Sequence, residues 1–458
     1  MKLKFKDIFK IESCSFEFIG PDSILQQPIQ GVSIDSRTIN PNELYFALIG
    51  ENHDGHNFVE EVYQKQAIAA IVEKKWWQQN QHKLQNKTVL VVEDSLRALQ
   101  ELANFYRKQF TIPVIALTGT NGKTTTKEMI AAVLYKAGSV CKTQGNYNNH
   151  IGVPLTLFQL DNHHQYLVVE MGTNHFGEIA RLCEIAAPQY GLITNIGHGH
   201  TEFLRDIKGV TRAKMELFKH LHKTGGVIFA NTDDENITRK IKAFNSIKTY
   251  GFRGKPDIHA EDLGLNENGC AVLKVEETTI ALNVAGKHNM SNALAAIAVA
   301  KEFGIKINDI KSALESIHLP SKRMEIIKHN NITILNDSYN ANPESMLAAL
   351  HTLSGVQVPG KKYFVMGDML ELGDMAAKHH AKIGKSLRGF GIDTFFAYGP
   401  YSEEAIKHTP AGVTAQHFTD KTDLAKSLKN KLLSGDLILI KGSRSMKMED
   451  VLDKILKG

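Results

Sequence analysis

The chain has 458 residues, of which 42% are hydrophobic and 22% charged, and its formal net charge is +5 at pH 7. This length exceeds what one hydrophobic core usually supports, so we expect two or three domains of an ordinary globular protein. The basic residues are dispersed along the chain, which argues against a nucleic-acid partner. The four cysteines form no C-x-x-C pair, which argues against a zinc site and a disulfide framework.

The sequence predicts neither a signal peptide nor a membrane span. The N-terminal segment 1–7 alternates charged and apolar residues, and the apolar stretch 293–300 is far shorter than the roughly 20 residues that a spanning helix needs. We therefore expect a cytoplasmic protein.

Residues 1–94 are predicted to form a small α/β domain of short strands. Turn residues cluster at 40–42 and 50–55, between apolar runs of strand length. These patterns predict a helix at 56–66 and strands at 32–37, 43–48, 67–72 and 89–92.

Residues 95–319 are predicted to form a central domain with a mostly parallel sheet, because strand and helix patterns alternate there. A helix that begins at Asp94 or Ser95 leads toward the first of its strands. After Pro320 the alternation restarts and predicts a smaller, Rossmann-like domain over 320–458. The expected strands of these two domains are 114–117, 167–169, 191–194, 227–230, 332–335, 363–366, 394–397 and 437–440.

The segment TGTNGKTTT, at 118–126, follows the strand 114–117 and precedes a predicted helix at 127–136. A glycine-rich turn between a strand and a helix can direct backbone N–H groups at a phosphate, and its lysine can reach the β- and γ-phosphates. A threonine hydroxyl after that lysine can bind Mg²⁺. The sequence therefore predicts an ATP site, in a loop shorter than the usual P-loop, formed by Gly119, Thr120, Asn121, Gly122, Lys123, Thr124 and Thr125.

Other polar residues follow predicted strands, where ligands of parallel sheets bind. Glu170 comes directly after the strand 167–169 and could ligate a metal that bridges phosphates. His198 and His200 lie in a glycine-rich loop after the next strand, and the residues alone leave open which of them faces the site. By default Lys214 would be an exposed helical lysine, and Asn289 a helix cap.

Taken together, these segments resemble the Mur ligases, the ATP-dependent amide-forming enzymes that build the peptidoglycan peptide. The short glycine loop is typical of that superfamily, and the resemblance covers nearly the whole chain. Within the family, the Asn-rich stretch and the Met-Leu-Glu-Leu segment favour the ligase that adds D-alanyl-D-alanine to UDP-N-acetylmuramoyl-tripeptide. The matching segments are 123–128, 145–157, 170–172, 336–343 and 367–373.

The resemblance implies roles for individual residues. Lys123, Lys214, His200 and Arg323 would be catalytic, with Arg323 at the γ-phosphate, and Asn289 and Asp337 would hold adenine and ribose. Two Mg²⁺ ions would be held by Thr124, Glu170, His200 and Lys214, the last as a carbamate. The implied substrate-binding residues are Ser33, Asp35, Ser36, Arg37, His56, Asn146, Asn148, Asn149 and Thr173.

The implied reaction joins two small molecules, UDP-N-acetylmuramoyl-tripeptide and D-Ala-D-Ala, through an acyl phosphate, and the family habit is a monomer. One alternative is the sister ligase that adds the third amino acid to UDP-MurNAc-dipeptide. That enzyme typically carries a D-N-P-R motif, whereas residues 340–344 read NANPE without an arginine. A second relative is folylpolyglutamate synthase. From other classes, a P-loop motor or switch driven by ATP hydrolysis and an inactive binding protein are the remaining alternatives.

Overall fold

The computed structural model describes residues 1, 3–199 and 201–457. Its contacts divide the chain into two compact units. The first unit comprises 1–116, 138–173 and 177–190, and the second comprises 117–137, 174–176 and 191–458. The boundary passes through strands β8 (Val114–Thr118) and β11 (Tyr190–Ile193). The three expected domain ranges differ from these units and stay a prediction, although each range contains a sheet of its own.

The first unit contains a five-stranded sheet in the order β2-β7-β6-β5-β4. All its neighbouring strands are parallel except β2, which runs antiparallel to β7 at one edge. A core that includes Tyr45, Val59, Val62 and Val89 joins this sheet to α1. The elements are β2 (Glu17–Ile19), β4 (Gly31–Ser33), β5 (Glu43–Phe46), α1 (Val59–Gln64), β6 (Ala69–Glu73), α2 (Lys74–Asn80) and β7 (Val89–Val92), and a short pair of β1 (Leu3–Lys4) with β3 (Pro28–Ile29).

The rest of the first unit belongs to the central segment of the chain. Strand β10 lies beside β9 in parallel, and helix α3 starts at an N-cap in which the Asp94 carboxylate accepts a hydrogen bond from Arg97 N. The elements here are α3 (Ser95–Arg107), β9 (Val140–Lys142), α5 (Gly152–Leu157), β10 (Tyr166–Glu170) and α6 (Glu178–Ala186).

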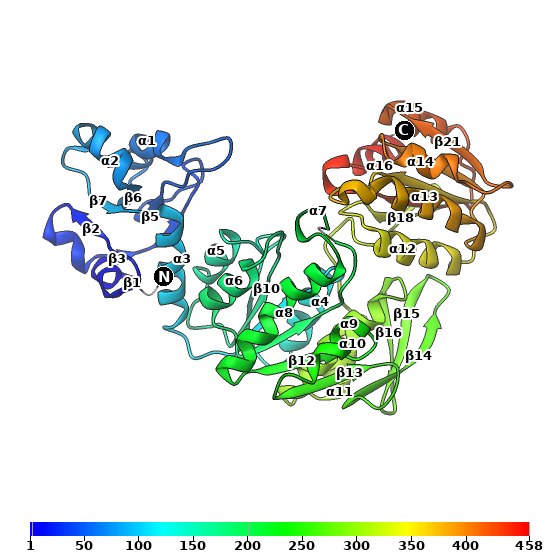
Figure 1. Cartoon of the computed structure of the whole chain (residues 1–458), viewed down its shortest axis with the longest axis horizontal. Coiled ribbons are helices and arrows are strands. Elements are labelled where there is room, and N and C mark those ends of the chain that lie inside the picture. The colour runs from blue at the N-terminus through cyan, green and yellow to red at the C-terminus, as the bar shows by residue number, and fades with distance from the viewer. Residues whose placement is uncertain (2, 200, 458) are drawn as a thin grey trace. The chain divides into compact units, whose positions relative to one another are not determined.

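In the second unit, the chain passes from β11 through parallel strands into an antiparallel ribbon. Strands β12 and β13 are parallel, whereas β14, β15 and β16 form the ribbon, which Figure 1 shows plainly. Helices α4 and α10 pack against each other. The elements are β12 (Val227–Asn231), β13 (Ile247–Gly251), β14 (Ile258–Leu265), β15 (Cys270–Val275), β16 (Thr278–Ala285), α4 (Lys123–Leu134), α7 (Thr201–Leu204), α8 (Ile207–Thr224), α9 (Glu235–Ile241), α10 (Asn289–Glu302) and α11 (Ile307–Glu315).

The C-terminal segment forms a six-stranded sheet in the order β17-β18-β22-β19-β20-β21, parallel except for β17. Alternate residues of its strands face two separate cores. Leu439 packs with α12 and α13, whereas Ile438 and Ile440 pack with α15 and α16. The elements are β17 (Glu325–His329), β18 (Ile332–Asp337), α12 (Pro343–Gly355), β19 (Lys362–Gly367), α13 (Ala376–Ser386), β20 (Thr394–Tyr398), α14 (Ser402–Lys407), β21 (Thr414–Phe418), α15 (Lys421–Lys429), β22 (Leu437–Lys441) and α16 (Glu449–Leu456).

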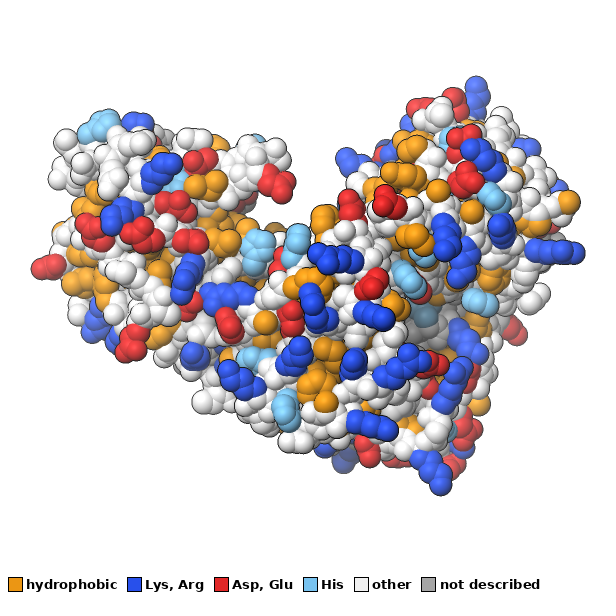
Figure 2. Space-filling view, viewed as in Figure 1, with side chains coloured by type: hydrophobic (Ala, Val, Ile, Leu, Met, Phe, Trp, Pro, Cys, Tyr) orange, Lys and Arg blue, Asp and Glu red, His pale blue; other side chains and the backbone are white. Residues whose placement is uncertain are grey.

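The predicted fold class, mixed α/β with mostly parallel sheets, is confirmed. Two element predictions need correction. The strand expected at 32–37 ends at Ser33, because the Asp35 carboxylate accepts a hydrogen bond from Arg37 N and closes a turn. The helix expected from 127 begins at Lys123, directly after Gly122. Among the described residues, no helix has the length and apolar character needed to cross a bilayer. On the visible face of both units, Figure 2 shows basic side chains interspersed with acidic ones.

Candidate functional site

The glycine loop, residues 118–123, connects β8 to α4 and has a backbone that only glycine fits at two positions. Gly122 has φ 77°, and a Cβ there would lie 2.3 Å from the side-chain oxygen of Asn292. A Cβ on Gly119 would lie 1.8 Å from the Thr194 hydroxyl oxygen. Both glycines are therefore needed to bring this loop against α10 and the end of β11.

The loop is held by two residues that follow β11. Asn121 N donates to the Asn195 side-chain oxygen at 2.9 Å, and Asn195 Nδ2 donates back to Asn121 O at 3.0 Å. The Thr194 hydroxyl donates to the same carbonyl at 2.6 Å. Thr120 joins the same loop, because its hydroxyl oxygen accepts a hydrogen bond from Gly197 N at 2.9 Å. Sequence reasoning missed Thr194 and Asn195, although their place after a parallel strand was a usable signal.

Lys123 folds back over the loop that it ends. Its ammonium donates to Gly119 O at 2.8 Å and to Thr120 O at 3.3 Å, so the positive charge lies beside the loop backbone at the start of α4. Thr124 and Thr125, in the first turn of the helix, are buried. A cation, a helix N-terminus and a curled backbone in one place form a suitable anion site.

Asn289 lies in a buried chain of amide hydrogen bonds at the start of α10. Its Nδ2 donates to Ala285 O at 2.7 Å, and its oxygen accepts from Asn292 Nδ2 at 2.8 Å. The Asn292 oxygen accepts in turn from the Thr126 hydroxyl of α4 at 3.1 Å. This chain fixes the first turn of α10 beside the glycine loop.

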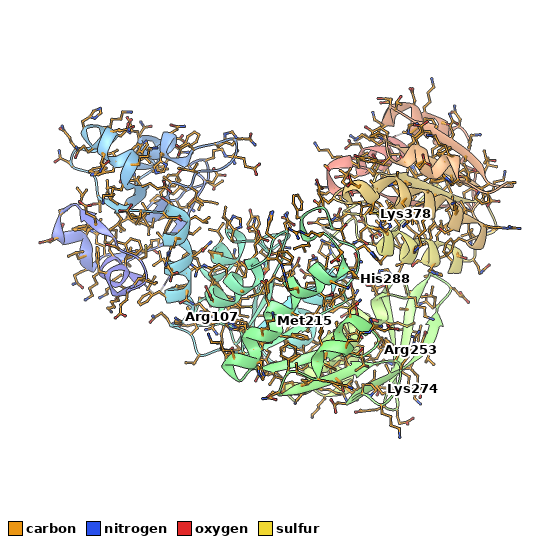
Figure 3. The ribbon with its side chains drawn as sticks, viewed as in Figure 1. Arg107, Met215, Arg253, Lys274, His288 and Lys378 are labelled. Atoms are coloured by element: carbon orange, nitrogen blue, oxygen red, sulfur yellow. The ribbon has the colours of Figure 1, made fainter. Side chains whose placement is uncertain are left out.

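Lys214 is only 2% exposed, which corrects the default expectation of a solvated lysine. It lies one turn from Val210 and Leu217 on the buried face of α8, and that helical spacing was the signal that could have revealed its burial. Figure 3 labels its neighbour Met215 on the same helix. Burial, and then the charge of Lys123, lower the pKa of Lys214 well below its usual range. The side chain is therefore a candidate for the neutral, nucleophilic amine form.

Arg323 and Asp337 lie at the β17–β18 end of the C-terminal sheet. The Asp337 carboxylate accepts a hydrogen bond from Lys441 Nζ at 2.5 Å and another from Met324 N at 3.1 Å. The Arg323 guanidinium lies 3.7 Å from the centre of the Tyr339 ring. The hydrogen bond from Met324 N to Asp337 attaches the turn that carries Arg323 to the end of β18.

Of the two histidines in the loop after β11, the structure describes His198. The His198 ring nitrogen Nδ1 lies 2.5 Å from a carboxylate oxygen of Glu344, which also accepts from His198 N at 3.1 Å. His198 is therefore engaged with the first turn of α12. His200, for which the resemblance implies catalysis and metal binding, lies outside the described residues.

In the first unit, Glu170 is buried at the carboxyl end of β10. Its Oε1 accepts a hydrogen bond from Asn148 Nδ2 at 2.8 Å, which orients the carboxylate. The Asn149 side-chain oxygen accepts a hydrogen bond from Gly152 N, the first residue of α5, at 2.8 Å, and the carbonyl of exposed Asn146 accepts from Asn148 N at 2.7 Å. The Thr173 hydroxyl donates to Glu178 at 3.1 Å. The Asn-rich segment and Glu170 are thus brought together.

The expected sugar-binding residues of the first unit divide into exposed and buried ones. Arg37 forms a two-pronged ion pair with Asp35, at 2.9 and 2.6 Å, and its side chain is 84% exposed. Hydrogen bonds from Arg37 lower the pKa of Asp35 to about 2. Ser33 is buried, and its hydroxyl oxygen accepts from Asp35 N at 3.2 Å. The buried Ser36 contacts Lys65 through its carbonyl oxygen at 2.7 Å.

His56, an expected substrate-binding residue, has contacts that suit a structural role. Its ring lies against Trp76, Nδ1 donates to the Asp54 carboxylate at 2.6 Å, and Nε2 accepts from Glu73 N at 3.0 Å. Both ring nitrogens are thereby occupied, so the imidazole holds the surrounding turn in shape.

Three family models match successive parts of the chain. They are described as "Mur ligase family, catalytic domain" at 28–107, "Mur ligase middle domain" at 117–300 and "Mur ligase, glutamate ligase domain" at 322–444. The chain is also 38% identical over 439 residues to the UDP-N-acetylmuramoyl-tripeptide--D-alanyl-D-alanine ligase of Bacillus subtilis (strain 168), a match that covers 94% of each protein. The chain belongs to the Mur ligase family.

Solved structures of this family agree with the fold. The crystal structure of MurF from Acinetobacter baumannii matches with a TM-score of 0.89 and 31% identity, and covers 99% of each chain. MurF ligase from Thermotoga maritima in complex with ADP matches with a TM-score of 0.83 and 28% identity, over 94% of this chain and 97% of that one. These matches extend over both units, so no large part of the chain falls outside the Mur ligase fold.

Within each unit, the structure groups the predicted residues of this Mur ligase. The second unit brings the glycine loop together with Asn195 and α10, and it buries Lys214 near the charge of Lys123. The first unit brings Glu170 to Asn148. Arg323 and Asp337 share the end of the C-terminal sheet.

Proposed function

We propose that the chain is an ATP-dependent ligase that joins D-alanyl-D-alanine to UDP-N-acetylmuramoyl-tripeptide. The observation that carries this proposal is the 38% identity to a ligase of that name over 94% of both proteins. The related ligase from T. maritima, solved in complex with ADP, supports the use of ATP. The glycine loop, with Lys123 beside its carbonyls, has the features that a triphosphate requires.

The reaction must supply a leaving group, because a carboxylate has none. A terminal carboxylate oxygen of the tripeptide attacks the γ-phosphorus of ATP, forming an acyl phosphate while ADP leaves. The amine of D-Ala-D-Ala then attacks the acyl carbon, inorganic phosphate leaves, and the nitrogen loses its proton. Lys123 and Arg323 stabilise the negative charge on the transferring phosphoryl group. Asn289 and Asp337 would hold adenine and ribose.

The donor groups fit Mg²⁺, which prefers oxygen ligands and keeps several waters and phosphate oxygens. Among residues 1, 3–199 and 201–457, no three His, Cys, Asp or Glu side chains cluster in a way that could cage a metal. An ion bound mainly through phosphates needs only a few protein ligands, and in the second unit Thr124 can provide a hydroxyl. Glu170, in the first unit, stays a ligand that the resemblance implies. We assign His200 to the same set. When bound, the metal neutralises phosphate charge.

Lys214 is proposed to act as a carbamate. A neutral lysine amine adds to CO₂, forms an N–C bond and releases one proton, which converts the neutral side chain into an anionic one. The burial that lowers the pKa of Lys214 favours this neutral amine. The resulting carboxylate-like group would support a second Mg²⁺.

The remaining assignments concern substrate and organisation. Ser33, Asp35, Ser36 and Arg37 would hold the UDP-sugar, with exposed Arg37 as the group that can reach a diphosphate, and the Asn-rich segment with Thr173 would line the peptide. His56 would contribute by shaping its turn. We retain the domain ranges 1–94, 95–319 and 320–458, and we propose a cytoplasmic monomer, since nucleotide-linked substrates are available inside the cell.

The test is phosphate release with ATP and Mg²⁺, with UDP-MurNAc-tripeptide and D-Ala-D-Ala supplied singly and together and the product weighed. We expect release only with both substrates, and a mass gain of one dipeptide minus water. Activity with UDP-MurNAc-dipeptide and a free amino acid instead would assign the sister ligase. ATP hydrolysis that needs no muropeptide would favour a motor or switch.

A further inference from the structure

Tyr339 lies in a charged cluster of which the proposed reaction uses only Arg323. The cluster consists of Lys322, Arg323, Tyr339, Arg444 and Glu449, all in the C-terminal segment. The guanidinium carbons of Arg323 and Arg444 lie 3.7 and 5.9 Å from the centre of the Tyr339 ring. An aromatic face attracts a cation, and a guanidinium group can also stack on it.

The cations of the cluster differ in what holds them. Arg444 and Lys322 both bind Glu449, at 2.5 and 3.0 Å. Burial raises the pKa of Glu449, but its backbone hydrogen bond and those from Lys322 and Arg444 lower the pKa overall. Arg323 makes no hydrogen bond or ion pair to any residue that the structure describes. Because a stacked guanidinium presents its N–H groups at the edge, the ring holds Arg323 without using its donors.

The backbone brings the ring to the arginine. Tyr339 N donates to Lys322 O at 3.1 Å, next to Arg323 in the chain. Lys322 and Met324, on either side of Arg323, have φ values of 69° and 51°, which side chains other than glycine rarely adopt. Such conformations persist where surrounding contacts enforce them, and they are concentrated at functional sites. The turn is therefore shaped so that Arg323 lies on the ring.

We propose that Tyr339 is a positioning residue that holds Arg323 by the face of its ring and leaves the guanidinium donors available for the γ-phosphate of ATP. The inference rests on the proposed function, since it concerns the phosphate that this reaction transfers. It assigns to Tyr339 an effect on the γ-phosphate step and none on the diphosphate part of the nucleotide.

The test compares Tyr339→Leu with Tyr339→Phe, and uses Tyr401→Leu as a control for the loss of a tyrosine. Tyr401 is 45% exposed in the same segment. Its ring lies beside His380 and its backbone N donates to Asp368, and neither of these is a proposed site residue. For each protein, kcat is measured, together with the affinities for ADP and for a non-hydrolysable ATP analogue that retains the γ-phosphate. Circular dichroism and the thermal midpoint establish that each variant is folded.

For Tyr339→Leu we expect about a tenfold loss of kcat and a weaker analogue affinity of similar size, while ADP affinity stays within about twofold. Tyr339→Phe should restore most of both losses, because it restores the ring. Equal weakening of ADP and analogue, or a Phe variant as impaired as the Leu variant, would overturn the proposal. So would full activity and full analogue affinity in Tyr339→Leu. The nucleotide affinities do not depend on the peptide substrates, so a failed ligase assay of the unmodified protein would overturn the proposed function separately.

Discussion

The glycine loop and the Asp35–Arg37 turn are both short polar segments that follow a strand, yet they are held in different ways. In the loop, Asn121 donates one hydrogen bond to Asn195 and accepts another from it, and Asn195 is 74 residues away in the chain. In the turn, the Asp35 carboxylate binds Arg37, two residues away, through both its backbone N–H and its guanidinium. The loop is shaped by tertiary structure and the turn by local structure.

This difference predicts how each segment responds to substitution. A loop held by partly buried groups that are distant in the chain is pre-organised, so substitutions in it should reduce both stability and nucleotide binding. Substitutions in a local turn with an exposed arginine should leave the stability of the protein nearly unchanged and should weaken only the affinity for the substrate. The following variants test this contrast, beginning with the largest expected effect.

The largest effect is expected at Lys214, whose side chain is buried in the second unit. We expect Lys214→Ala to lower kcat by about a thousandfold or more, since the carbamate and the metal charge that it supports are both lost. Short-chain carboxylic acids added to the assay should restore part of the activity by supplying the missing carboxylate.

Lys214→Arg is the matched control, because arginine retains a long basic side chain at this position and forms no carbamate. It should be as inactive as the alanine variant. Full turnover in either variant without added acid would rule out the carbamate and leave Lys214 as a packing residue.

Gly122→Ala tests the close approach of the loop to α10. A Cβ at this position combines φ 77° with a 2.3 Å contact to Asn292, so we expect a loss of about 2–3 kcal/mol in the free energy of unfolding and weaker ADP binding. Gly225→Ala is the control, because Gly225 has φ 74° and no atom lies within 4 Å of its Cβ position. It should lose only about 1 kcal/mol and bind ADP normally. Equal losses in urea unfolding would show that backbone strain, and not the Asn292 contact, sets the requirement for glycine.

Substitutions of Asn195 test the clamp, by which we mean the two hydrogen bonds between Asn195 and Asn121. Asn195→Ala leaves the Asn121 N–H without its acceptor, which should cost about 1–3 kcal/mol of stability and raise the KM for ATP. Asn195→Asp keeps that acceptor and loses only the donor to Asn121 O, which the Thr194 hydroxyl still serves. The aspartate variant should therefore lose less stability, measured by urea unfolding because its charge would itself disturb ATP binding. A larger loss for aspartate than for alanine would refute the clamp.

Much of the fold and part of the site could be predicted from the sequence. The strand–loop–helix around Lys123 is local, and its residue types and spacing reveal it directly. The clamp by Asn195 depends on which strands become neighbours, a property that composition and spacing do not encode. The ribbon β14–β16 was missed although residues 270–275 alternate buried and partly exposed side chains for part of their length. Lys214 was misjudged because lysine is usually solvated, although its helical spacing with Val210 and Leu217 places it on the buried face of α8.

The Asp35–Arg37 pair should give the smallest change in stability. The pKa of Asp35, about 2, lies below the roughly 3.9 of an aspartate in the unfolded chain. Any stability that the pair contributes is therefore present above about pH 4 and is lost as the pH falls through 2. Because the Arg37 side chain is 84% exposed, solvent screens the pair, and we expect Arg37→Ala to change the thermal midpoint at pH 7 by no more than about 2 °C.

The same variant should nevertheless raise the KM for the UDP-linked substrate by about tenfold, because an exposed guanidinium with a fixed partner is suited to bind a diphosphate. Lys10→Ala, which breaks the exposed Lys10–Asp7 pair at 2.7 Å, is the control and should leave that KM unchanged. If Arg37→Ala instead destabilised the protein as much as Gly122→Ala, the turn would not be a local structure, and the contrast with the glycine loop would fail. A normal KM with normal stability would remove Arg37 from the substrate site and leave the diphosphate to other cations of the first unit.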